Sequence, residues 1–224
     1  MKTSTERARE LVPALILTLL SMIQALALEF FWSKIGVSEF LWQWGWTAAI
    51  GWLQIAVMLE GILLIWVLYV SFVLRFSWLP SLEDTLLPFL IGLFEFAMID
   101  LTEPAMVGPW MMLLALIFAL AVLSSHTTMR RAEQDPANAY FFNQISTSRG
   151  WRSYTHSGAS IAGLLLIGLL LWWSNPPPWV VFVALLIALG AMFFQYLQAR
   201  TYWLHSLTSE EGDEGTNVMK DQPG

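Results

Sequence analysis

Six continuous apolar runs, each long enough to cross a lipid bilayer as a helix, constrain this chain more than any other feature. An α-helix rises about 1.5 Å per residue, so about 20 apolar residues span the hydrocarbon core. Only 12% of the 224 residues are charged, against about 25% in soluble domains. The sequence therefore predicts an all-α, polytopic transmembrane helix bundle. Its six spans are expected at about 11–29, 47–73, 85–102, 109–125, 157–174 and 178–198.

The basic residues predict how these spans are oriented. If the N-terminus faces the cytoplasm, only Lys34 of the 11 Lys and Arg residues falls on the outer side. Cytoplasmic loops carry an excess of Lys and Arg, so both termini are predicted to be cytoplasmic. We expect the chain to lie in a bacterial-type cytoplasmic (inner) membrane, with the lipid bilayer as its first partner and no nucleic acid.

The segments outside the spans are short. The predicted parts are a cytoplasmic N-terminus (1–10), a six-span membrane domain (11–205) and a disordered acidic cytoplasmic tail (206–224). Acidic residues and glycines are typical of disordered chain. The cytoplasmic loop 126–155 is the largest connection. Within it, Asp135 followed by Pro136 is typical of a helix start, which predicts a short interfacial helix from Pro136 to about Ile145.

Small residues predict where one pair of helices packs closely. Ala159 and Gly163 are four residues apart near the start of the fifth span, and Gly158 and Ala162 repeat the same spacing. This small-xxx-small pattern lets two helix backbones approach each other in a membrane. We expect this face to contact a neighbouring helix.

Two glutamates lie inside the predicted membrane spans and are the most informative residues for function. A charged group at the bilayer centre costs about 2.5–3.5 kcal/mol. By helix rise, Glu60 and Glu95 lie roughly 22 and 16 Å from the cytoplasmic edge on consecutive spans, so the sequence predicts that they are neighbours. Two adjacent carboxyl groups do not both ionise easily, so we expect at least one to hold a proton near neutral pH.

The two glutamates allow two interpretations. They can form a path for protons or small cations, with Glu29, Asp100 and Glu103 at its outer mouth. Alternatively, each glutamate only hydrogen-bonds across a helix interface, and the outer acids only provide solubility. The possible hydrogen-bond partners in the second case are Gln24, Gln54, Gln195 and Ser21.

Three histidines offer a different chemistry. His126, His156 and His205 all fall near the cytoplasmic interface, where neighbouring helices could bring them together as a metal site. They lack H-x-x-x-H or H-E-x-x-H spacing, and ordinary boundary residues are the simpler interpretation. The absence of cysteine excludes thiolate zinc sites and iron–sulfur clusters. Because no nucleotide-binding motif occurs either, we expect no cofactor.

These observations give three functional hypotheses. The first is a channel or transporter for protons or small cations that uses the buried carboxylates. The second is a non-catalytic membrane subunit or scaffold, which would act in a homo-oligomer or with partner membrane proteins. The third is an intramembrane metal-dependent enzyme that uses the histidines. The lack of enzyme motifs favours a non-enzymatic protein, and only transport makes use of the buried acids.

Overall fold

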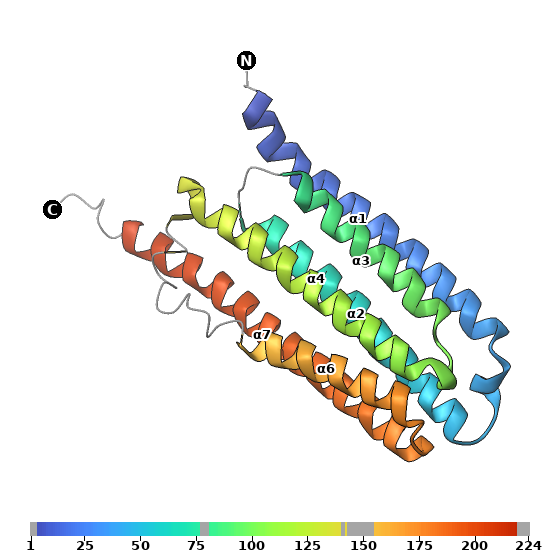
Figure 1. The fold of residues 1–224 in the computed structure, drawn as a ribbon. Helices are drawn as coiled ribbons and strands as arrows, with labels where there is room; N and C mark the ends of the chain where they lie inside the picture. The colour runs from blue at the N-terminus through green and yellow to red at the C-terminus, as the bar shows by residue number, and fades with distance from the viewer. Residues whose placement is uncertain (1–3, 77–80, 140–141, 143–154, 219–224) are drawn as a thin grey trace.

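The computed structural model describes residues 4–76, 81–139, 142 and 155–218 (Figure 1). Within these helices the side chains of residues 4–10, 82, 83, 85, 198, 199 and 201–218 lie outside the description. The described chain forms helices joined by short turns and contains no strand. This confirms the predicted all-α bundle.

Six long helices make up the described fold. They are α1 (Ser4–Val37), α2 (Trp46–Arg75), α3 (Leu82–Asp100), α4 (Val107–Gln134), α6 (Thr155–Ser174) and α7 (Pro178–Val218). Three short 3-10 helices accompany them: η1 (Glu39–Trp42), η2 (Pro104–Met106) and η3 (Pro136–Asn138). Five of the long helices include and extend their predicted spans, whereas α3 ends at Asp100, two residues before the predicted end of the third span.

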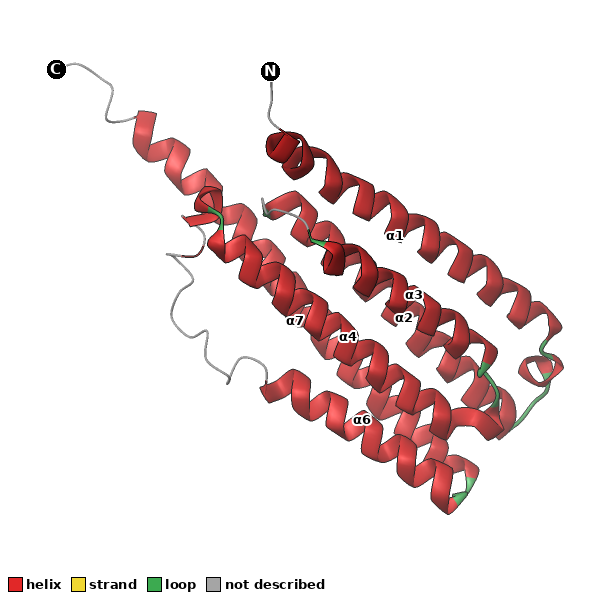
Figure 2. Cartoon of the chain, turned by 45° about the horizontal axis from the view of Figure 1, so that its top comes forward, coloured by secondary structure: helices red, strands yellow, loops and turns green. Residues whose placement is uncertain are grey.

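The long helices lie side by side and alternate in direction (Figures 1 and 2). Helix α3 packs between α1 and α4, while α6 packs on α4 and α7 packs on α2. The start of α1 and the end of α7 lie at the same end of the bundle (Figure 1). This arrangement fits an even number of crossings, and the side of the membrane on which that end lies stays a prediction.

Five of the long helices are long and apolar enough to cross a membrane: Leu11–Val37, Trp46–Arg75, Pro104–Gln134, Thr155–Ser174 and Pro178–Leu197. The chain is therefore an integral membrane protein. Helix α3 differs because its 19 residues include four acids: Glu83, Asp84, Glu95 and Asp100. It nevertheless runs the length of the bundle between α1 and α4 (Figure 1).

Two segments, after α4 and at the end of α7, differ from the sequence prediction. Helix α7 continues to Val218, so residues 206–218 are helical where the sequence predicted a disordered tail. Once a helix has nucleated, adding a residue is cheap, and Leu and Glu are good helix formers. The predicted helix from Pro136 is represented by η3, which Asp135 caps by accepting a hydrogen bond from the Ala137 N–H at 3.1 Å. Most of its remainder lies outside the described residues.

Glycines bring α4 and α6 into backbone contact. A Cβ atom added at Gly168 would lie 3.0 Å from the carbonyl oxygen of Gly108, and one added at Gly108 would lie 2.8 Å from the Trp172 nitrogen. The sequence placed this close packing at the wrong position on α6, around Gly158 and Gly163. A Cβ added at Gly158 or Gly163 would meet no described atom within 4 Å. Glycine packing is thus present on α6, but further along the helix.

Candidate functional site

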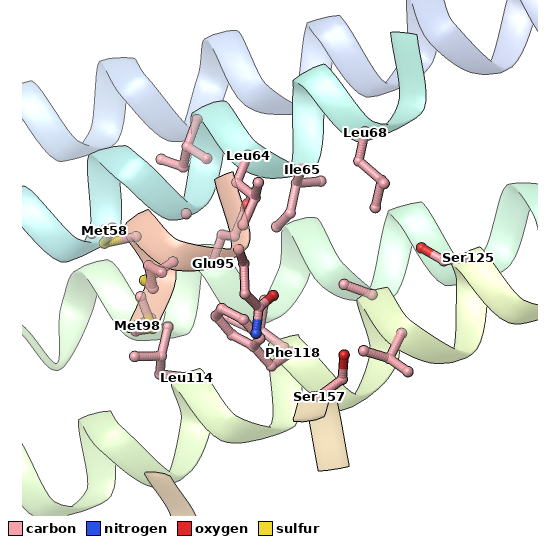
Figure 3. A pocket seen from close by; sticks show the side chains of 17 residues that line it. Met58, Leu64, Ile65, Leu68, Glu95, Met98, Leu114, Phe118, Ser125 and Ser157 are labelled. Carbon is pink, nitrogen blue, oxygen red and sulfur yellow. The ribbon is translucent and has the colours of Figure 1, made fainter. Parts of the chain in front are cut away.

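A partly open cavity of about 280 Å³ lies between α2, α3, α4, α6 and α7 (Figure 3). Most of its lining is aliphatic, methionine or phenylalanine side chain, including Met58, Leu114 and Phe118. Its polar lining consists of Glu95, Gln195 and the two serines Ser125 and Ser157. Among the described residues that line the cavity, Glu95 alone carries an ionisable side chain.

Glu95 is buried at the contact between α3 and α1. It is 2% exposed, and the Gln24 Nε2 donates hydrogen bonds to its two carboxylate oxygens at 3.1 and 3.0 Å. The helices approach closely at this level, because a Cβ atom added at Gly92 would clash with the Ile23 side chain. Glu95 therefore lines the cavity while an amide from α1 holds its carboxylate.

Glu60 occupies a different environment from Glu95. It is half-buried on α2, and its neighbours Gly61 and Ile62 line the cavity whereas Glu60 does not. Gly61 points toward α7, since a Cβ there would lie 3.1 Å from the Met192 Cε. Among the described residues, the structure gives Glu60 and Glu95 no hydrogen bond to each other. Of the two glutamates predicted to form the path, Glu95 therefore lines the cavity and Glu60 lies outside it.

The other residues considered as partners have separate surroundings. Gln195 lines the cavity together with Glu95. Ser21 accepts a hydrogen bond from the Trp66 Nε1 at 3.4 Å. Gln54 is fully buried, and its amide nitrogen and oxygen have no hydrogen-bond partner in the described part of the chain. Of the four expected partners, only Gln24 bonds to Glu95.

The outer acids surround a lysine. The Lys34 Nζ donates a hydrogen bond to the Asp100 carbonyl oxygen at 2.9 Å, and lies 3.8 Å from the Asp100 Oδ1 and 4.0 Å from the Glu103 Oε1. A cation at the carboxyl end of a helix interacts favourably with the helix dipole, so Lys34 fastens α1 to the end of α3. Glu29 is exposed on α1.

A buried acid at the other end of α3 escaped the sequence analysis. Asp84 is 4% exposed, and its Oδ2 lies 2.8 Å from the Arg131 Nη1. Its carboxylate also accepts hydrogen bonds from the Ser81 N–H at 2.8 Å and from the Thr128 hydroxyl at 3.4 Å. The pattern Ser81-x-x-Asp84 before an apolar run is a capping signal and could have revealed it. Asp84 joins the start of α3 to α4.

The histidines and a buried tyrosine complete the survey of polar residues. His126 on α4 and His156 on α6 are exposed, and the side chain of His205 on α7 lies outside the described residues. The described residues hold no group of three or more His, Cys, Asp or Glu side chains that could bind a metal ion. Tyr69 and Ser124 share a hydrogen bond between α2 and α4.

The fold and the cavity define an integral membrane helix bundle in which Glu95 lies on the wall of a largely apolar cavity. Comparison with protein-family models, with curated proteins and with solved structures finds no match to this chain. The case for a function rests on the geometry around Glu95.

Proposed function

We propose that this protein is a transporter or channel for protons or small cations, and that Glu95 is the carboxylate that the moving cation meets. The bacterial-type cytoplasmic membrane remains its proposed location. The observation that supports this function is the position of Glu95, which is 2% exposed, without a basic partner among its described contacts, and on the wall of a 280 Å³ cavity. Ionisable residues inside membranes mark ion and proton pathways more often than packing sites.

Gln24 can hydrogen-bond to Glu95 whether or not the carboxyl group carries a proton. A glutamine amide carries both donors and an acceptor. Its Nε2 donates to the carboxylate, whereas its Oε1 has no hydrogen-bond partner in the described structure. Rotation of the amide would present the oxygen to a protonated carboxyl group. The pair can therefore satisfy hydrogen bonds in either protonation state, as a proton-carrying site requires.

The cavity also offers room for water next to the acid. One water molecule occupies about 30 Å³ of liquid, so a 280 Å³ space accommodates several. The hydroxyl groups of Ser125 and Ser157 and the Gln195 amide can hydrogen-bond to such water. Figure 3 shows Ser125 toward the end of the cavity at which Leu68 lies, and Met58 and Met98 toward the other end. The polar lining is thus asymmetric.

The test is a flux measurement in proteoliposomes that contain a trapped pH-sensitive dye, repeated with potassium and sodium gradients. We expect Glu95→Gln to abolish most of the wild-type flux. Glu60→Gln is the matched control, because it makes the same chemical change at a similar depth but outside the cavity, and it should retain flux. Equal flux in wild type and Glu95→Gln, or no flux from correctly inserted wild type, would overturn the proposal.

One observation favours the alternative of a non-catalytic membrane subunit. Helix α6 exposes Leu165, Leu166, Leu169 and Leu170 along its outer side, and its glycines Gly158 and Gly163 have open space beside them. Small residues without a neighbour suit a partner helix. Gentle solubilisation followed by mass measurement tests this alternative: stoichiometric recovery with a second membrane protein supports it, and a lone monodisperse chain contradicts it.

A further inference from the structure

The chemistry of the cavity wall narrows the class of substrate. We infer that the cavity binds a small lipophilic organic cation, such as an amine or quaternary ammonium with an apolar body, and that Glu95 is its counter-ion. This inference rests on the proposed transport function and names the kind of cation that occupies the site. Charge, lining and the support of the carboxylate each contribute to it.

The charge of the lining selects a monocation. Among the described residues of the wall, Glu95 is the one with an ionisable side chain, so a single positive charge on the ligand balances it. An anion would be repelled by this carboxylate in a medium of low dielectric constant. A neutral ligand would gain no charge attraction from this carboxylate.

An organic cation fits the wall better than a metal ion. Hard metal ions such as calcium take six to eight oxygen ligands, whereas this wall offers one carboxylate, the Gln195 amide and two serine hydroxyls. The described residues contain no group of three or more metal-ligating side chains. An ammonium group that carries its own apolar substituents needs fewer oxygens, because those substituents contact the rest of the wall.

The remaining wall suits the apolar body of such a ligand. Three flexible methionines, Met58, Met98 and Met192, line the cavity, and methionine adapts to irregular apolar shapes. Phe118 adds an aromatic ring, a group that attracts ammonium ions. Small-molecule sites combine such an apolar lining with a few fixed polar groups in volumes of about 300–1,000 Å³. The cavity volume of about 280 Å³ lies just below that range, so it suits a small ligand.

Gln24 positions the carboxylate for this role. It holds Glu95 from α1, and the described side chains of α1 contribute no residue to the cavity wall. The bond therefore does not fill the cavity, and Gln195 remains on the wall to contact the ligand. An oriented carboxylate on a largely apolar wall binds a cation more strongly than a mobile carboxylate in bulk water.

The experiment compares benzyltrimethylammonium with neopentylbenzene, its neutral carbon analogue, by calorimetric titration of the purified full-length protein in detergent. We expect benzyltrimethylammonium to bind wild type and Glu60→Gln with equal affinity, and neopentylbenzene to bind much more weakly. The affinity for benzyltrimethylammonium should fall by about tenfold or more in Glu95→Gln, because a desolvated charge pair is lost. Ala121→Phe keeps the acid but fills part of the cavity, and it should also abolish binding.

Several outcomes would overturn this inference. They are equal affinity of wild type for the cation and its neutral analogue, unchanged binding in Glu95→Gln, or unchanged binding in Ala121→Phe. Proton flux measured without any organic cation separates the two proposals. Glu95-dependent proton flux without benzyltrimethylammonium binding would refute the organic substrate and leave the transport function standing. Glu95-dependent binding without flux of any cation would refute transport and support the binding site.

Discussion

Helix α3 holds two buried acids, Asp84 and Glu95, in opposite circumstances. Asp84, in the first turn of α3, contacts the Arg131 guanidinium, the Thr128 hydroxyl and a backbone N–H. Glu95, eleven residues further along, is buried as deeply but receives only the Gln24 amide. Burial alone therefore does not identify a functional acid. The difference lies in the partner, because an adjacent cation compensates the charge of Asp84, whereas an amide leaves the charge of Glu95 free to change.

The largest predicted effect concerns the stability of the Asp84 contact. Arg131→Ala should lower the free energy of unfolding by about 2–4 kcal/mol, because it leaves a buried carboxylate without its cation. Denaturant titration of the detergent-solubilised protein measures this loss. The double variant Asp84→Leu, Arg131→Met should recover most of it, since apolar residues can replace a buried ion pair. An unchanged unfolding midpoint in Arg131→Ala would show that the pair is not structural.

The second prediction is that Glu95 matters for flux rather than for stability. Glu95→Gln should reduce cation flux by about tenfold or more while changing the free energy of unfolding by less than about 1 kcal/mol, because Gln keeps the size and polarity of Glu without its charge. Flux and unfolding are measured on the same preparation. If Glu95→Gln unfolds as readily as Arg131→Ala, the main role of Glu95 is to stabilise the fold, as that of Asp84 is.

The third prediction compares two buried amides. Gln24→Leu should destabilise the protein by about 1–2 kcal/mol, because the Glu95 carboxyl group loses its hydrogen-bond donor, and it should reduce flux. Gln54→Leu is the matched control. Its amide has no partner among the described residues, so its removal should leave stability unchanged or raised. Equal destabilisation by both variants, measured by denaturant titration, would contradict the assigned role of Gln24.

The smallest predicted effect lies at the outer end of α3. Lys34→Met should change stability by less than about 1 kcal/mol, because exposed ion pairs contribute little. The double variant Asp100→Asn, Glu103→Gln should lower flux by no more than about twofold if these acids mainly hold Lys34. A larger loss of flux in proteoliposomes, strongest at low ionic strength, would indicate that Asp100 and Glu103 concentrate cations at the mouth of the path.

Hydropathy was sufficient to predict the helices but not their rotation. The apolar runs predicted the six long helices and their antiparallel order, and residue types placed Gln24 among the possible partners of Glu95. The face that α2 turns toward the cavity depends on contacts such as that of Gly61 with Met192. The rotation of α3 about its axis depends in the same way on the close contact of Gly92 with Ile23. These interhelical fits are not encoded in a single helix's periodicity. For this reason Glu60 and Glu95 looked equivalent in the sequence and are not equivalent in the structure.

The buried Asp84 contact shows a second limit of sequence reasoning. Its three partners lie 3, 44 and 47 residues away, and only the nearest belongs to a recognisable local pattern. The helical continuation of α7 through 206–218 shows a third limit, because composition predicts disorder while an existing helix favours propagation. Tertiary packing and cooperativity decided both cases.

The acids of α3 also affect how this helix enters the membrane during synthesis. Each charge near a helix centre disfavours insertion by an isolated segment, and α3 carries four acids within 19 residues. Gln24 on α1 is synthesised before Glu95, so it is available when α3 emerges. Arg131 on α4 is synthesised later and completes the Asp84 contact only after the next helix follows. The place of α3 in the bilayer is therefore set by the helices made before and after it, rather than by its own hydropathy.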